Sequence, residues 1–240
     1  MKLAWVVLVV LLSACTVAPI SSRAQSDRSH LALAQEYLQQ GQLGLAQQAL
    51  LSVTPATQET SAYRRLKALY LLRNREVTAA IDYHQESLQL APNDDFLMNN
   101  LGVLLAQQGQ YDAACELYQK AVLISAYRSP SSLINLARCA LRQEDVNKAW
   151  KLLHQAKEIA LLPDIGLLTE LNLVLIRNDL NRARQINNII QADTAFARNQ
   201  EHVEEFECLS RQVLARESDL TSNSLPSPIA CIVQGIKNNE

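Results

Sequence analysis

Residues 92–124 read PNDDFLMNNLGVLLAQQGQYDAACELYQKAVLI, and this stretch decides the fold. Pro92 ends a preceding helix, and the Asn-Asp-Asp sequence after it is typical of a helix N-cap. Gly109 then supplies a turn between two helical segments. The stretch therefore predicts a pair of helices joined by a short turn.

Small residues recur along the chain with a nearly constant step. One series has separations of 34, 34, 35 and 34 residues and consists of Ala46, Ala80, Ala114, Ala149 and Ala183. Twelve residues earlier stand Ala34, Ala68, Gly102, Ala137 and Leu171, and seven residues later stand Val53, Ser87, Ala121, Ala156 and Ile190. A 34-residue period with one helix-turn-helix hairpin per unit is the tetratricopeptide repeat (TPR) step. We therefore predict an all-α TPR superhelix of helix-turn-helix hairpins.

The small residues have a packing reason. Two antiparallel helices approach closely only where side chains are short, so Gly102 is expected to face Ala114 and Ala121. The fifth repeat is degenerate, with Leu171 in a small-residue position and Asn187 in an aromatic one, as in terminal units of a solenoid. We predict five TPR-like repeats over residues 28–194, a capping helix or partial sixth repeat over 195–217, and a C-terminal tail over 218–240.

The N-terminus departs from this pattern. Leu3 to Leu12 is a ten-residue apolar run, which as a helix spans about 15 Å, half of a bilayer core. It predicts a signal peptide over residues 1–14. The following Leu12-Ser13-Ala14-Cys15 resembles the lipobox of bacterial lipoproteins. That resemblance implies a diacylglycerol and N-acyl lipid (palmitate among the acyl chains) on Cys15, and Thr16 after it implies the outer membrane, facing the periplasm. Residues 15–27 are predicted to be the lipidated N-terminus and a flexible tether.

The sequence offers no pattern for catalysis. No phosphate-binding glycine loop, no H-E-x-x-H pair and no G-x-S-x-G turn occurs. The net charge of −2 comes without a clustered basic surface, which argues against a nucleic-acid partner. We expect no catalytic residue, no metal, no small-molecule substrate and no cofactor beyond the lipid. His84, which occupies the position of Tyr118 in the next repeat, is interpreted as a packed helix residue, and His202 as part of a solvated acidic helix face.

Four cysteines remain besides Cys15. In an oxidising compartment an even number permits disulfides. Cys115 and Cys139 fall on neighbouring helices of the third and fourth repeats, and Cys208 with Cys231 would join the tail to the capping helix. Buried free thiols are the alternative in each place, and the sequence leaves the connectivity open.

The repeat geometry also predicts a protein-binding groove. In a TPR superhelix the first helix of each hairpin lines the concave face. The groove has a mixed apolar floor with a few positive and amide groups, suited to an extended or helical peptide. Its predicted residues are Arg65, Leu69, Leu72, Phe96, Asn99, Val103, Ile134, Arg138 and Leu141. The alternative is that some of them only pack one hairpin against the next.

Several features together resemble a known family. These are the lipobox, the tether, the segment Met98 to Gly102, the one-residue expansion before the fourth repeat, and the segments Tyr127 to Ser132 and Asn135 to Cys139. They resemble the type IV pilus biogenesis/stability lipoproteins, the PilF/PilW secretin pilotins. The sequence departs from that family at Leu101, where the family has tyrosine, and lacks its cysteine at 104 or 105. The TPR lipoproteins of Flp/Tad pilus systems are therefore a close competitor.

The resemblance implies a function. A pilotin is a monomeric outer-membrane lipoprotein that binds secretin subunits and promotes their outer-membrane targeting and multimerisation. The alternative is a periplasmic TPR adaptor that scaffolds peptidoglycan enzymes or another envelope complex. Both hypotheses need a protein partner and a lipid anchor, and neither needs an enzyme.

Overall fold

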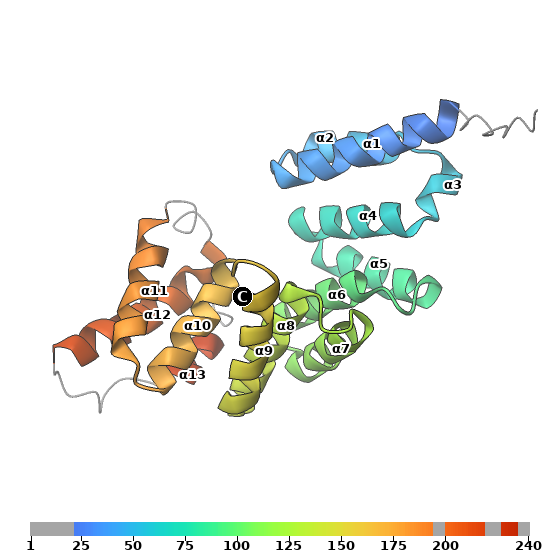
Figure 1. Cartoon of the computed structure of the whole chain (residues 1–240). Helices are drawn as coiled ribbons and strands as arrows, with labels where there is room; N and C mark the ends of the chain where they lie inside the picture. Colours follow the sequence, from blue (N-terminus) through green and yellow to red (C-terminus); the bar gives the residue numbers. More distant parts are fainter. Residues whose placement is uncertain (1–21, 194–199, 219–226, 235–240) are drawn as a thin grey trace, which may run out of the picture. The chain divides into compact units, whose positions relative to one another are not determined.

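The computed structural model describes residues 22–193, 200–218 and 227–234, and all regular secondary structure in these ranges is helical (Figure 1). The chain divides into two compact units, Met1–Tyr63 and Arg64–Glu240. The predicted signal peptide and the predicted lipidation site Cys15 lie outside the described residues. Within the described ranges, no helix is long and apolar enough to cross a bilayer.

The first unit contains a helix pair and one short helix. α1 (Ser22–Gln39) packs against α2 (Leu43–Leu51), and α3 (Pro55–Gln58) follows. The small residues Ala34 and Ala46 of the repeat series are fully buried here. They occupy the helix contact that the 34-residue period predicted for them.

The predicted flexible tether over residues 15–27 extends too far, because α1 already begins at Ser22. Asp27 explains the difference, since its side chain is buried against the loop between α2 and α3. Its Oδ2 accepts hydrogen bonds from the hydroxyls of Thr54 and Thr57, each at 2.5 Å, and its Oδ1 accepts from the Thr54 backbone N–H at 3.2 Å. These hydrogen bonds, those of the Thr54 hydroxyl first, lower the pKa of Asp27. The polar start of α1 is therefore held by a contact 27 residues away.

The second unit continues the series of antiparallel helix pairs and ends with two further helices. Its elements are α4 (Ser61–Arg73, which begins at the end of the first unit), α5 (Val77–Leu90), α6 (Asp95–Gln107), α7 (Tyr111–Ile124), α8 (Pro130–Arg142), α9 (Val146–Ile159), α10 (Asp164–Ile176), α11 (Leu180–Ala192), α12 (Gln200–Glu217) and α13 (Pro228–Gln234). α6 packs with α7, α8 with α9, and α10 with α11. The predicted capping helix over 195–217 corresponds to α12, and residues 195–199 at its predicted start lie outside the described ranges.

Each hairpin turn has the same backbone geometry, whatever residue occupies it. The residues with left-handed φ between the paired helices are Gly41, Arg75, Gly109, Glu144 and Asn178. The residue after each of them donates its N–H to the carbonyl five positions earlier, at 2.8 to 3.2 Å. Only two of the five are glycines, although an L side chain is disfavoured in this conformation. The helix pairing therefore imposes the turn at Arg75 and Glu144, where the sequence carries no turn signal.

The extra residue before the fourth repeat also has a structural form. The connection between α7 and α8 contains two consecutive left-handed residues, Ala126 and Tyr127, with φ of 50° and 59°. The N–H of Tyr127 closes the end of α7 on the carbonyl of Val122 at 2.9 Å. The loop thus accommodates the extra residue of the 35-residue step. The number of residues from the start of α8 to the start of α9 is the same as from the start of α6 to the start of α7.

Within the third repeat, Gly102 of α6 lies close to the ring of Tyr118 of α7. A Cβ placed on Gly102 would lie 2.6 Å from Cε1 and 3.0 Å from Cδ1 of that ring. Ala114 and Ala121, which the sequence analysis placed opposite Gly102, are fully buried as well, and Tyr118 is 5% exposed. Tyr118 is therefore the side chain that requires a glycine at position 102.

His84 takes the Tyr118 position in the second repeat. It is fully buried, and its Nδ1 lies 2.6 Å from the carbonyl oxygen of Ala80. Its Nε2 has no hydrogen-bond partner among the described residues. Burial lowers the pKa of His84 below its usual 6.5, which means that the folded protein favours the neutral imidazole. The interpretation of His84 as a packed helix residue is confirmed.

We predict that Gly102→Ala lowers the free energy of unfolding by about 1–3 kcal/mol, because the added methyl group displaces the Tyr118 ring. Gly44→Ala in α2 is the matched control, since a Cβ there meets nothing within 4 Å. Its effect should be neutral or stabilising by up to about 1 kcal/mol. Thermal unfolding followed by circular dichroism measures both changes. An equal effect of the two substitutions would contradict the close approach at Gly102.

Candidate protein-binding groove

The predicted groove residues on α4 and α6 keep part of their surface. Arg65, Leu69 and Leu72 on α4, and Phe96 and Val103 on α6, are all half-buried. Arg65 joins the two helices, because its guanidinium carbon lies 5.5 Å from the centroid of the Phe96 ring. A cation over an aromatic face is attracted by the ring quadrupole. These five residues remain the candidate for contact with a partner.

The charge of Arg65 is balanced by two carboxylates at the start of α6. Its Nε donates to Asp94 Oδ2 at 2.8 Å, and a second nitrogen lies 3.7 Å from Asp95. Asp94 is the buried N-cap of α6, where its Oδ1 also accepts from the N–H of Leu97 at 3.1 Å. The predicted positive group in this part of the groove is therefore neutralised. The surface offers a partner mainly apolar side chains.

Asn99, predicted as an amide of the groove floor, joins two repeats. It is only 8% exposed, and its Oδ1 accepts a hydrogen bond from Nδ2 of Asn135 on α8 at 3.0 Å. A buried polar group of this kind is usually satisfied inside the protein. The alternative from the sequence, packing of one hairpin against the next, holds at this position.

The predicted groove does not extend over α8. Ile134 and Leu141 are both fully buried, so they present no surface to a partner. Arg138 is 15% exposed and donates from both terminal nitrogens to the carboxylate of Glu205 on α12, at 2.9 and 2.7 Å. The assignment of these three residues to an open groove is therefore wrong. The reason is that helices from the C-terminal part of the chain cover this face.

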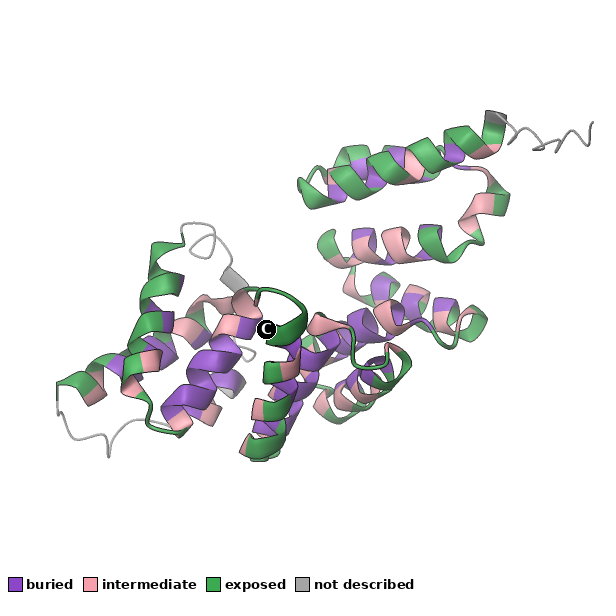
Figure 2. Cartoon of the chain, viewed as in Figure 1, coloured by how far each residue is buried: buried purple, intermediate pink, exposed green. Residues whose placement is uncertain are grey.

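Helices α10, α12 and α13 provide that cover. A Cβ on Gly166 of α10 would lie 3.2 Å from Cδ1 of Ile134, which shows how closely α10 approaches α8. Ile232 of α13 is 2% exposed and belongs to the same core cluster as Ile134 and Leu141. Figure 2 shows α10 as largely buried. The concave side of the fourth repeat is thus filled from within the chain.

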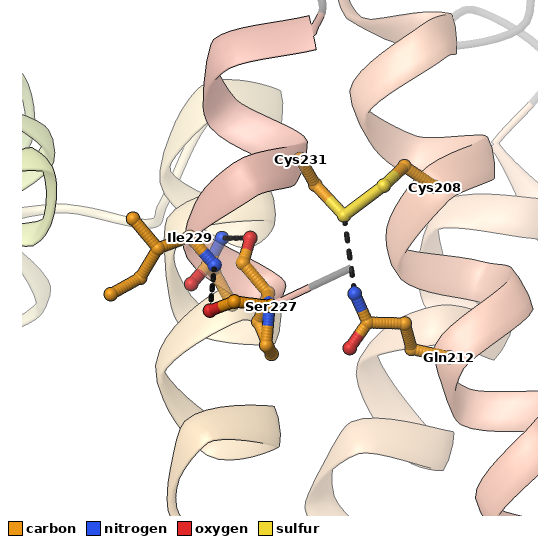
Figure 3. Close-up of a disulfide and its surroundings, with 7 residues drawn as sticks. Cys208, Gln212, Ser227, Ile229 and Cys231 are labelled. Carbon is orange, nitrogen blue, oxygen red and sulfur yellow. Dashed lines mark hydrogen bonds between the residues drawn. A yellow bond between two sulfur atoms is a disulfide. The ribbon is translucent and has the colours of Figure 1, made fainter. Parts of the chain in front are cut away.

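Two disulfides join the helices of this region. Cys115 of α7 is bonded to Cys139 of α8, with 5.8 Å between the Cα atoms. Cys208 of α12 is bonded to Cys231 of α13, and the side-chain nitrogen of Gln212 lies 3.3 Å from the Cys231 sulfur (Figure 3). Of the alternatives left open by the sequence, the structure adopts the disulfides. The second one fixes α13, which lies in the predicted tail, to α12.

The described residues show no arrangement for metal chemistry. No group of three or more His, Cys, Asp or Glu side chains there is placed to hold a metal ion. An open hollow of about 440 Å³ lies along α7 and α8, with the Cys115–Cys139 disulfide in its wall. Its charged residues are two acidic and two basic side chains, namely Asp112, Glu116, Lys120 and Lys148.

Sequence models of the tetratricopeptide repeat match residues 31–95 and 94–162. These ranges coincide with the first four helix pairs, which have the 34-residue step and a common turn geometry. The chain is therefore a tetratricopeptide-repeat protein, and the all-α fold predicted from the sequence is confirmed. TPR folds typically act as scaffolds for protein-protein interaction.

Solved structures with the same fold come from distant proteins. Pseudomonas aeruginosa PilF superposes with a TM-score of 0.62 at 16% identity, over 88% of this chain and 91% of PilF. A chain of the APC/C hetero-tetramer Cut9-Hcn1 gives 0.61 at 14% identity over 88% of this chain, which spans 40% of that chain. A TPR protein from Parabacteroides merdae gives 0.52 at 14% identity, over 89% of this chain and 86% of that chain. No curated protein matches the sequence. At these identities the likeness is one of fold.

We predict that Arg138→Met destabilises the protein by about 3–5 kcal/mol, because it leaves the Glu205 carboxylate buried without its charged partner. Arg184→Met is the matched control, since it removes an arginine from an ion pair with Glu217 in which the arginine is 55% exposed. The loss there should stay within about 1 kcal/mol. Urea unfolding gives both values. Similar losses would mean that α12 does not cover α8 in solution.

Proposed function

We propose that this TPR protein is an outer-membrane lipoprotein, anchored through Cys15, that binds secretin subunits and promotes their targeting and multimerisation in pilus biogenesis. The observation that carries the proposal is the fold likeness to PilF, which extends over 88% of this chain and 91% of PilF. The segment Leu12-Ser13-Ala14-Cys15 resembles a lipobox, which supports the same proposal independently, because a pilotin requires a lipid anchor.

The surface on α4 and α6 suits the binding step. Leu69, Leu72, Phe96 and Val103 offer half-buried apolar area, and Arg65 is already paired with acidic residues. An extended or helical segment can bind such a surface by burying its own apolar side chains. Because Arg65 faces both Asp94 and Asp95, this group carries no net positive charge, so attraction of an acidic partner should contribute little to binding.

The lipid would supply the delivery step. Several acyl chains on one terminus hold a protein to a membrane far more firmly than one chain does. A secretin subunit bound to the repeats would then be confined near the membrane, which raises its local concentration for multimerisation. The process requires no energy source and no catalytic residue.

The alternative is a periplasmic adaptor that scaffolds peptidoglycan enzymes or another envelope complex. The likeness to a Cut9-Hcn1 chain, with a TM-score of 0.61, is nearly as high as that to PilF. A fold does not by itself select a partner. Crosslinked pull-down of the lipidated protein from outer membranes separates the two functions, because recovery of peptidoglycan enzymes without a secretin would favour the adaptor.

We predict that Leu69→Glu and Val103→Glu each weaken binding to a purified secretin periplasmic region by at least about tenfold, because a charge is buried on binding. Leu123→Glu on α7 is the control, since Leu123 is 56% exposed and lies outside the groove. Fluorescence anisotropy measures affinity, and circular dichroism checks that helicity is retained. Unchanged affinity in both groove variants would exclude this surface as the binding site.

The anchor is tested with Cys15→Ser in cells. The purified repeats should keep their affinity for the secretin, while secretin multimers should no longer collect in the outer membrane. Normal secretin assembly in the Cys15→Ser strain would overturn the lipid-dependent delivery.

A further inference from the structure

Helix α13 occupies the place where a TPR groove would receive a ligand. It contacts α8, the first helix of the fourth repeat, together with α10 and α12. Its Ile232 is 2% exposed and shares a core cluster with Ile134 and Leu141, the two predicted groove residues of α8. Ile232 also lines a small pocket with Asn135 and Arg138, so a segment from the far end of the sequence packs against α8.

The contacts of α13 are those of a bound peptide. Pro228, Cys231 and Ile232 are buried, whereas Ser227 just before the helix is exposed. Asn172 of α10 donates from Nδ2 to the backbone carbonyl of Pro228 at 2.6 Å. A groove binds a short helix in this way, by burying aliphatic side chains and holding a backbone group that any sequence provides.

The helices beneath α13 have a core of their own. The second core cluster consists of Leu168, Leu171, Val174, Leu175, Ala183, Ile186, Ile190, Cys208, Leu209, Val213 and Cys231. Ten of these residues belong to α10, α11 and α12, and among the described residues Cys231 is the only member from α13. Arg138 and Glu205 also join α8 directly to α12. The surface that receives α13 is thus built by the other helices.

A covalent bond keeps α13 on this surface. The Cys208–Cys231 disulfide ties the middle of α13 to α12 (Figure 3). A tether of this kind gives the segment a high effective concentration at the surface, so even a weak intrinsic affinity suffices to keep it bound. An experiment that removes the disulfide can therefore measure the affinity of the noncovalent contacts alone.

We propose that the concave face of the fourth repeat, formed by α8, α10 and α12, is a binding site for a short aliphatic helix, which α13 occupies in cis. Its ligand class is a protein segment of about two helical turns that buries an isoleucine beside Asn135 and Arg138 of α8 and presents its first-turn carbonyl to Asn172. A partner protein with such a segment binds there when α13 is displaced. This site is distinct from the surface on α4 and α6 to which the proposed function assigns the secretin.

The experiment uses the full chain with Cys208→Ala and Cys231→Ala and with a protease recognition sequence inserted within residues 219–226. After cleavage and removal of the C-terminal fragment, a fluorescent synthetic peptide of residues 227–234, with alanine at position 231, is titrated into the protein. We expect saturable binding by anisotropy and an unchanged helical circular dichroism spectrum. An Ile232→Asp peptide should bind at least about tenfold more weakly, because it loses a buried side chain. A Ser227→Asp peptide, altered at an exposed position, should bind like the parent peptide.

The uncleaved chain with its disulfide intact is the second protein in the test. It should bind the peptide at least about tenfold more weakly than the cleaved protein, because α13 competes in cis. Equal binding to both proteins would place the peptide elsewhere and overturn the proposal. Unfolding of the cleaved protein, or a folded cleaved protein that does not bind the peptide, would also overturn it and would make α13 an integral part of the core. None of these results changes the test at Leu69 and Val103.

Discussion

Gly102 and the ring of Tyr118 determine how closely α6 and α7 approach, and the equivalent positions of the other repeats are buried as well. The corresponding pairs are Ala34 with Leu50, Ala68 with His84, Ala137 with Leu153, and Leu171 with Asn187, and every one of these residues is buried. A small residue in most of the first positions lets the helices pack at short distance. The pairing of α6 with α7 depends on this contact.

The 34-residue step was sufficient to predict the hairpins, since it reports a contact between residues close in sequence. The sequence could not show contacts made across long separations. Asp27 accepts hydrogen bonds from Thr54 and Thr57. These bonds hold the start of α1, a segment whose polar sequence had predicted a flexible tether. Arg138 meets Glu205 from 67 residues away, and no periodic signal marks that pair. The left-handed turns at Arg75 and Glu144 were equally invisible, because packing rather than residue type selects them.

The candidate site shows the same division between local and distant contacts. The period placed nine residues on the concave side, and for α4 and α6 the structure leaves five of them half-buried and available. On α8 the same reasoning failed at Ile134, Arg138 and Leu141, because helices α10, α12 and α13 return over that face. Asn99, on α6, is engaged with Asn135 and marks the boundary between the two parts. The second unit of the chain thus has an open apolar surface on α4 and α6 and a filled face on α8.

This division has a consequence for how the protein recognises others. An open surface with half-buried apolar side chains favours partners that contribute apolar side chains, and a filled surface excludes partners until its occupant leaves. Selection by exclusion of competitors is a recognised route to specificity. The lipid anchor proposed at Cys15 would act on both surfaces alike, because it restricts where the whole protein meets its partner.

Thiol labelling of single cysteines tests the central claim, that the C-terminal helices close the concave face at α8 and leave it open at α4. In a chain with Cys15→Ala and both disulfides intact, cysteine is introduced either by Leu72→Cys on α4 or by Leu141→Cys on α8. Leu141 is fully buried and Leu72 is half-buried. The account predicts that the cysteine at position 141 reacts at least about tenfold more slowly than that at position 72, because it must wait for local opening. Equal labelling rates would show that the face of α8 is open and would contradict the account.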